Sequence, residues 1–243
     1  MNTASEQDRT PCQAGNRSGP VDCEHCVIRQ KMLFADLDVE KAAFQLKGVT
    51  GACFQAGDII YHMGEEPRAL YSVGKGIVKL TLVSAEGQPR IVRLIGPGGV
   101  VGLEAQLGQA YEHTVECLTE VHACRIPALT LRQLIRDQPV LCKGMLKQWH
   151  EHTCMADKHL LDLSSGTVRQ RVIQLLALLD ELCARSKVAL LLPTNQDCAT
   201  IIGTRVESVS RVMAELKRNG VLAHRKNGDW QFNADAEPEP DGE

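Results

Sequence analysis

Cysteines near the N-terminus are the first residues whose types and spacing could do chemistry. Cys12 stands alone, and Cys23 and Cys26 form a C-x-x-C pair within VDCEHCVIRQKML. Ten cysteines in 243 residues are too few for a disulfide scaffold, so they indicate small buried residues, metal ligands or redox thiols. The pair is a candidate for metal ligation. A zinc site, a redox disulfide and the absence of any function stay open as alternatives.

A second candidate group, Glu207, Ser210 and Arg211, lies near the C-terminus at spacings of three and four residues. Such spacings bring side chains together on one face of a helix. An arginine can donate two hydrogen bonds to guanine O6 and N7, and a glutamate can accept one from cytosine N4. A solvated face with a Glu207–Arg211 pair is the alternative, and the neighbouring elements favour base reading in a major groove.

Those neighbouring elements form a helix–turn–helix. Thr194 with Asp197 three residues later predicts the start of a helix, and Gly203 permits the sharp turn. The second helix is predicted to begin near Val206 and to end at Gly220. The following VLAHRKNGDWQF predicts a β-hairpin wing around its Asn-Gly turn.

The chain upstream changes from a strand pattern to a helical one. Between Phe54 and Ile126, short apolar or alternating runs are separated by glycine turns, many about 8–12 residues apart, which predicts an antiparallel roll or barrel. After Pro127 a short helix is predicted, then a long one after Pro139, then a strongly apolar one over 166–185.

The long helix carries an apolar stripe at steps of three and four, wide enough to pack on the roll and to form a coiled-coil seam. A homodimer is therefore expected, and a helix packed only against its own domain is the alternative. The stripe consists of Cys142, Met145, Trp149, His152, Ala156, His159 or Leu160, and Leu163. Its histidines, together with His150, are expected on a wet face or in the seam rather than on a metal or haem.

These patterns predict an α+β chain, and its 44% hydrophobic and 23% charged residues are typical of a globular protein. The predicted parts are an N-terminal arm (1–32), a sensory β-roll (33–137), a dimerisation helix (138–164), a winged helix–turn–helix domain (165–233) and an acidic tail (234–243). Residues 164–232 hold ten Lys and Arg against six Asp and Glu, which is a weak indication of a polyanionic partner.

Several functional classes are disfavoured. No run approaches ~18 apolar residues and the N-terminus has no apolar signal segment, so a cytoplasmic protein without membrane contact is expected. The sequence has no glycine-rich phosphate loop, nucleophile elbow or HExxH site, so it is not expected to be an enzyme. A thiol oxidoreductase using Cys23 and Cys26 stays open.

The segment TNQDCATIIGTRVESVSRVMAELKRNGVL resembles the helix–turn–helix of the CRP/FNR superfamily of bacterial transcription regulators, with Glu207, Ser210 and Arg211 matching E-x-x-S-R. FQAGDIIYHMGEE, LYSVGKGIVKLTL and GPGGVVGLEAQLG resemble its cyclic-nucleotide-binding-type roll. The resemblance implies double-stranded DNA with palindromic TTGAT-type half-sites, and an action through RNA polymerase. Val206, where CRP-like members have arginine, favours the FNR-like site.

Members that bind cAMP carry a Gly-Glu pair and then an Arg-Ser pair that holds the cyclic phosphate. Here Glu104 is followed by Glu112, His113 and Thr114 in place of Arg-Ser. A phosphate would meet a carboxylate with no guanidinium to neutralise it. Sensing of cAMP is therefore not expected.

The N-terminal cysteines resemble the cluster motif of FNR-type oxygen sensors. That resemblance implies a [4Fe–4S] cluster held by Cys12, Cys23, Cys26 and Cys124, whose loss loosens the dimer and its grip on two half-sites. The position of a further N-terminal cysteine is occupied by Met32, and a thioether is a poor substitute for thiolate. Cys12 is therefore needed to complete the set.

Alternatives to this sensor remain open. Cys117 is the second choice for the ligand from the roll. A haem- or nitric-oxide-sensing member, or a regulator without a cluster, is the alternative function. The remaining cysteines are expected to be mostly small apolar residues. They are Cys53, Cys142, Cys154, Cys183 and Cys198.

Overall fold

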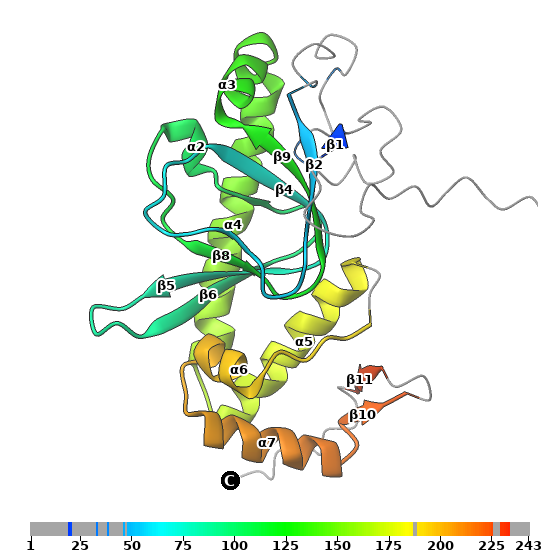
Figure 1. The fold of residues 1–243 in the computed structure, drawn as a ribbon. Helices are drawn as coiled ribbons and strands as arrows, with labels where there is room; N and C mark the ends of the chain where they lie inside the picture. The colour runs from blue at the N-terminus through cyan, green and yellow to red at the C-terminus, as the bar shows by residue number, and fades with distance from the viewer. Residues whose placement is uncertain are drawn as a thin grey trace, which may run out of the picture.

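The computed structural model describes residues 19–20, 33, 38, 46, 48–186, 189–225 and 229–233. A β-roll is followed by a long helix that runs along it, and then by a small helical domain with a two-stranded hairpin (Figure 1). This is the predicted α+β class and order of elements.

The roll consists of two antiparallel sheets with the orders β1-β2-β9-β4-β7 and β3-β8-β5-β6. The strands are β1 (Gly19–Pro20), β2 (Thr50–Phe54), β3 (Ile59–Tyr61), β4 (Ala69–Lys75), β5 (Val78–Val83), β6 (Pro89–Ile95), β7 (Val100–Val101), β8 (Thr114–Cys117) and β9 (Val121–Pro127). Apolar residues that alternate along the strands fill the space between the sheets, among them the fully buried Val73, Val78, Val115 and Val121.

Two short helices and one long helix adjoin the roll: α2 (Glu104–Leu107), α3 (Ala128–Asp137) and α4 (Val140–Ser164). Pro139 immediately precedes α4, as the sequence predicts, because proline cannot continue a preceding helix and fits a helix start. Figure 1 shows α4 running along the roll towards the C-terminal domain.

The stripe of α4 divides between two faces. Leu141, Met145, His152, His159 and Leu163 are buried against the rest of the chain. The large apolar residues exposed elsewhere on the helix are Val140, Leu146, Trp149, Leu160 and Leu161. The expectation of a wet or seam position is therefore wrong for His152 and His159, because both imidazoles point towards the roll.

The C-terminal domain contains α5 (Val168–Ser186), α6 (Asn195–Ile202), α7 (Val206–Arg218), β10 (Leu222–His224) and β11 (Trp230–Phe232). Buried leucines of α5 form its base, as the apolar run predicts. They are Leu175, Leu176, Leu179 and Leu182. The same core includes Ile77, Ile91 and Leu94 of the roll. The roll and the C-terminal domain are therefore joined by one continuous apolar core.

An ionic bridge reinforces this contact. The Lys79 ammonium of β5 lies 2.8 Å from Asp197 Oδ1 of α6 and 2.9 Å from Glu116 Oε1 of β8. Its side chain is only 11% exposed, so water screens these ion pairs weakly. In the described part of the chain, no helix is both long and apolar enough to cross a membrane.

Candidate nucleic-acid interface and sensory site

The turn between α6 and α7 is built from local hydrogen bonds. The Thr194 hydroxyl oxygen accepts from the Asp197 backbone N–H at 3.0 Å, and the same hydroxyl donates to Asp197 Oδ2 at 2.8 Å. Gly203 ends α6 in the left-handed conformation (φ 64°, ψ 55°) and its N–H donates to the Ala199 carbonyl. The predicted cap and turn are both confirmed, and they set the angle at which α7 leaves α6.

Helix α7 has a buried flank and an exposed one. Val209, Met213 and Leu216 are at most 5% exposed and pack into the domain core. The structure places Glu207, Ser210 and Arg211 on the exposed flank, within the first two turns. The three predicted reading residues therefore share one accessible face, which is the arrangement that a recognition helix requires.

Two neighbours of that face contribute in different ways. Val206 is half-buried and packs against the core, so the first helical position supports α7 rather than projecting outward. Arg205, which the sequence does not single out, is exposed immediately before the helix. A cation at this place suits a backbone phosphate beside the groove.

The hairpin is fixed to the end of α7. Its strands pair in the register Leu222↔Phe232, and the Lys217 ammonium lies 4.6 Å from the centre of the Trp230 ring. This cation–π contact ties the wing to the helix. The wing is confirmed, while its predicted turn residues lie outside the described residues.

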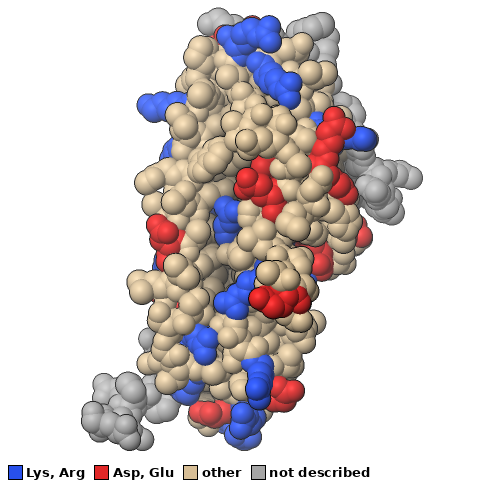
Figure 2. Space-filling model, turned by 90° about the vertical axis from the view of Figure 1, so that its left-hand side faces the viewer, with Lys and Arg blue, Asp and Glu red and all other residues tan. Residues whose placement is uncertain are grey.

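Basic and acidic side chains are mixed over the face drawn in Figure 2, which also carries Lys and Arg at its upper end. Figure 2 shows Lys and Arg side chains recurring from the middle of this face to its lower end, where α7 lies in Figure 1. Asp and Glu are interspersed among them. The lower end can therefore meet phosphates without presenting a uniformly basic surface.

Among the predicted cluster ligands, Cys12, Cys23 and Cys26 lie outside the described residues, as does Met32. Cys124 is half-buried on β9, opposite Gly51 of β2, and Gly51 in turn is opposite Gly19 of β1. Cys124 packs beside an apolar cluster that includes Leu33 and Leu46. Positions on both sides of the C-x-x-C pair therefore lie at or near this sheet.

The other cysteines divide into buried and exposed ones. Cys117, Cys183 and Cys198 are 1% exposed, as expected of small apolar residues. Burial raises the pKa of the Cys117 thiol to about 12, so Cys117 is a poor thiolate ligand. The same expectation is wrong for Cys142 and Cys154, which are exposed on α4.

Cys53 also departs from the expectation, because it takes part in a disulfide. It lies on β2 opposite His122 of β9, two residues from Cys124. Residues directly opposite each other on paired strands share a face of the sheet, and so do residues two apart on one strand. Cys53 therefore lies on the same face as His122 and Cys124. Its short apolar surroundings, GACFQ, gave no sign of this in the sequence.

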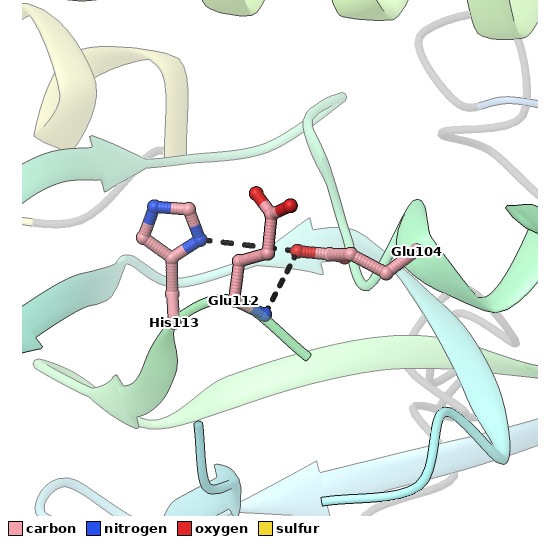
Figure 3. Close-up of side chains that lie close together, drawn as sticks. All are labelled: Glu104, Glu112 and His113. Carbon is pink, nitrogen blue, oxygen red and sulfur yellow. Dashed lines mark hydrogen bonds and ion pairs between the residues drawn. The ribbon is translucent and has the colours of Figure 1, made fainter. Parts of the chain in front are cut away.

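A cavity of about 280 Å³ lies between the roll and α4. Its polar lining includes Arg93 of β6, Glu104 of α2, Glu112, His113 and His152 of α4. Glu104 Oε1 lies 3.8 Å from His113 Nδ1 and accepts from the Glu112 backbone N–H at 3.3 Å. Arg93 Nη2 lies 2.9 Å from His113 Nε2. Figure 3 shows the three side chains of Glu104, Glu112 and His113 drawn together.

The Glu104 carboxyl is ionised at neutral pH. Its burial opposes ionisation, but hydrogen bonds from His113 and from the backbone N–H groups of Glu104 and Glu112 outweigh that effect, and the pKa of Glu104 lies below its usual value. This cavity therefore holds a fixed negative charge close to an imidazole and a guanidinium.

Residues 52–138 match the family of cyclic nucleotide-binding domains, and residues 170–231 match the Crp-like helix-turn-helix domain. The chain belongs to the CRP/FNR superfamily of transcription regulators. The predicted family and fold class are thereby confirmed.

Relatives of this CRP/FNR regulator agree. The chain is 27% identical over 213 residues to the transcriptional activator protein FnrL of Cereibacter sphaeroides, covering 83% of this chain and 84% of FnrL. It is 29% identical over 175 residues to the transcriptional regulator LdrP of Thermus thermophilus, covering 70% and 86%. These relatives support a DNA-binding regulator and a role other than catalysis, as predicted.

A solved structure shows the same fold. FixK2 from Bradyrhizobium japonicum superimposes with a TM-score of 0.64 at 21% identity, over 76% of this chain and 92% of that one. A likeness over this share of both chains shows that the two proteins have the same overall fold.

In this CRP/FNR regulator, the cavity of the roll differs from the sequence-based picture in one respect. A guanidinium is present after all, because Arg93 enters the cavity from β6. Leu80 of β5 is opposite Arg93 of β6, whereas the next residue, Thr81, is opposite Ile91. Residue 92 is therefore an extra residue in β6, and this bulge interrupts the alternation of inward and outward side chains along the strand. The premise that no guanidinium lines this cavity is therefore wrong. Arg93 contacts His113 there, and the absence of cAMP sensing stays a prediction.

Proposed function

We propose that this CRP/FNR regulator binds palindromic DNA as a homodimer, with one TTGAT-type half-site read by Glu207, Ser210 and Arg211 of each chain. The observation that carries the proposal is the exposed flank of α7, opposite a flank that is fully packed. Arg211 would donate to guanine O6 and N7, and Glu207 would accept from cytosine N4 of the same half-site. Val206 supports the FNR-like site.

The second chain is proposed to pack along α4. Leu146, Trp149 and Leu160 are 65%, 48% and 69% exposed on this helix. They follow the spacing of a coiled-coil seam, and burying them against a second copy removes apolar area from water. A palindromic site needs two copies of α7 held at a fixed distance, so a second copy of this chain is the occupant that the function requires.

We further propose that the regulator responds to oxygen or redox state through a [4Fe–4S] cluster held by Cys12, Cys23, Cys26 and Cys124. Thiolates are the usual ligands of such a group, and cysteine is the residue type at all four positions. Cys124 is half-buried rather than sealed in the core, unlike Cys117.

Chain length also supports this set. Gly19 is two strands away from Cys124, about 10 Å across the sheet. Cys23 is four residues beyond Gly19, a reach of up to ~14 Å. When bound, the cluster would supply sensitivity to oxidants, and the chain would supply one ligand from β9, beside the packing of the roll on α3 and α4. Transcriptional output through RNA polymerase is proposed from the family.

Dimeric DNA binding is tested by comparing a palindromic TTGAT duplex, a duplex with one half-site and a scrambled duplex. Two chains should bind each palindrome, and affinity should exceed that for the scrambled duplex by about a thousandfold or more. The single half-site should bind far more weakly, because the second contact loses its high effective concentration. Equal affinity for all three duplexes would overturn this part.

The cluster is tested by iron and sulfide analysis with visible absorption on anaerobically purified protein. Iron, sulfide and a broad absorption lost in air are expected, and Cys23→Ser and Cys124→Ser should abolish them. Cys154→Ser removes an exposed thiol of α4 and serves as the matched control. A sharp Soret band would favour haem instead, and iron-free colourless protein that still binds DNA would favour a regulator without a cluster.

A further inference from the structure

We propose that the cavity between the roll and α4 binds a divalent transition-metal ion through Glu104, Glu112 and His113. One ligand atom from each residue lies within 4.8 Å of the others, and Figure 3 shows the side chains gathered around one place. Two donors that each lie ~2.0–2.2 Å from one metal are at most ~4.4 Å apart, so only small side-chain movements are needed. This site is independent of the cysteines proposed above.

The donor set indicates the class of metal. Two carboxylate oxygens and one imidazole nitrogen suit Mn²⁺, Fe²⁺, Co²⁺ or Zn²⁺, whereas Ca²⁺ and Mg²⁺ prefer oxygen alone. The Glu104 and His113 side chains are 15% and 10% exposed, and Glu112 closes the set from the exposed side. The cavity therefore combines two carboxylates with a nearly buried imidazole, and a cation compensates their charge.

A buried residue without a partner also lines this cavity. His152 is 7% exposed, and its Nε2 has no hydrogen-bond partner in the described part of the chain. Burial is the main reason that the pKa of His152 falls to about 4, and the neighbouring side chains of Arg93, Glu104 and His113 also act on it. A neutral imidazole that faces a polar cavity without a partner indicates an occupant or a second arrangement of the lining.

Arg93 provides that second arrangement. A guanidinium can only donate, so its contact with His113 Nε2 makes that nitrogen the acceptor and leaves the ring proton on Nδ1. When a metal binds Nδ1, the Nδ1–H bond breaks and the proton moves to Nε2, so no net proton is released. Arg93 must then leave His113, and His152 Nε2 is an available acceptor in the same cavity.

This exchange would carry the signal from the roll to α4. The metal would hold Glu104, Glu112 and His113 together while Arg93 shifts its hydrogen bond from the roll to the helix. Because α4 also carries the proposed dimer face, a consequence for DNA binding rests on the proposed function. The metal site itself does not, since its ligands all belong to the roll.

The test is titration of the full chain with Mn²⁺, followed by calorimetry and by the loss of the free-ion electron paramagnetic resonance signal. Thiolates prefer softer metals, so Mn²⁺ avoids the ten cysteines. One Mn²⁺ per chain is expected. Glu112→Gln and His113→Gln should each weaken binding by more than about tenfold, a loss typical of altered metal sites.

The matched control is Glu120→Gln, which alters an exposed carboxylate paired with His122 at 2.6 Å. It should leave Mn²⁺ affinity unchanged, as should Cys124→Ser, which removes the proposed cluster ligand. Circular dichroism establishes that each variant is folded. Absence of Mn²⁺ binding, or binding unaffected by both Glu112→Gln and His113→Gln, would overturn the site without touching the cluster or the DNA proposal.

Discussion

His152 lies on a helix but is buried instead of exposed to water. Its ring faces the roll, is 7% exposed and has a pKa lowered to about 4, chiefly by burial. The folded chain therefore keeps the imidazole neutral at pH values where the unfolded chain protonates it. Folding and protonation of this residue oppose each other.

His152→Phe should make the stability less sensitive to acid. Because the unfolded pKa is 6.5 and the folded one about 4, His152 has no effect above pH 6.5 and lowers the free energy of unfolding as pH falls between these values. The full loss is about 3 kcal/mol. Urea unfolding at neutral pH and near pH 4 should show a smaller difference in the variant.

His150→Phe is the control, because His150 is exposed on the same helix. Its stability should follow the pH dependence of the unmodified chain. If His152→Phe and His150→Phe gave the same pH dependence, the buried neutral imidazole would not be the cause.

Single residues were predictable where local sequence decides their surroundings. Glu207, Ser210 and Arg211 are exposed because their helix is amphipathic, and helical spacing alone separates them from Val209. Arg93 was not predictable, because a bulge in β6 determines its direction. The disulfide of Cys53 was not predictable either, because the alternation of apolar residues around Cys53 does not distinguish a bonded cysteine from a small buried one.

At the scale of elements, the α6–α7 turn depends on one glycine. Gly203 has φ 64°, and an added Cβ would collide with the Arg90 guanidinium of β6. The turn is therefore constrained by its left-handed backbone, and a side chain at this position also requires the flexible Arg90 guanidinium to move aside.

Gly203→Ala should lower the free energy of unfolding by about 1–3 kcal/mol, from left-handed strain together with displacement of Arg90. Gly87→Ala is the control, since Gly87 has φ 77° but open space around its Cβ position. Thermal unfolding should show a greater loss for Gly203→Ala. Equal losses would mean that Arg90 does not restrict the turn.

The helices and strands themselves were largely predictable, since glycine turns, caps and a change from strand to helical period mark their limits. The two faces of α4 were not. A stripe at steps of three and four fits both a coiled-coil seam and packing on the roll, so the sequence could not show that His159 and Leu163 turn inward while Leu160 stays exposed.

At the scale of the whole molecule, Lys79 connects the roll to the DNA-binding domain. Burial lowers the pKa of its ammonium, but hydrogen bonds to Asp197 and Glu116 outweigh burial and raise it above its ordinary value. The contribution to stability is therefore complete below pH 10.5, the ordinary value, and is lost as pH rises through the folded pKa.

Lys79→Met should destabilise the chain by about 1–3 kcal/mol at neutral pH, because two carboxylates lose their cation in a poorly solvated contact. Lys147→Met is the control, since Lys147 is 75% exposed and pairs with Glu151 within one helix at 3.8 Å. That change should cost less than about 0.5 kcal/mol. Urea unfolding of both variants measures the difference, and indistinguishable midpoints would argue against a bridge between the two parts.

The central claim is that α7 reads DNA through its exposed flank, and base preference in Arg211→Ala tests it most directly. Affinities for a set of duplexes that vary one half-site position at a time should lose about 1–3 kcal/mol of preference at the guanine only. Arg218→Ala, at the far end of the same helix, should retain every preference. An Arg211→Ala protein that still selects the same guanine would contradict the assignment.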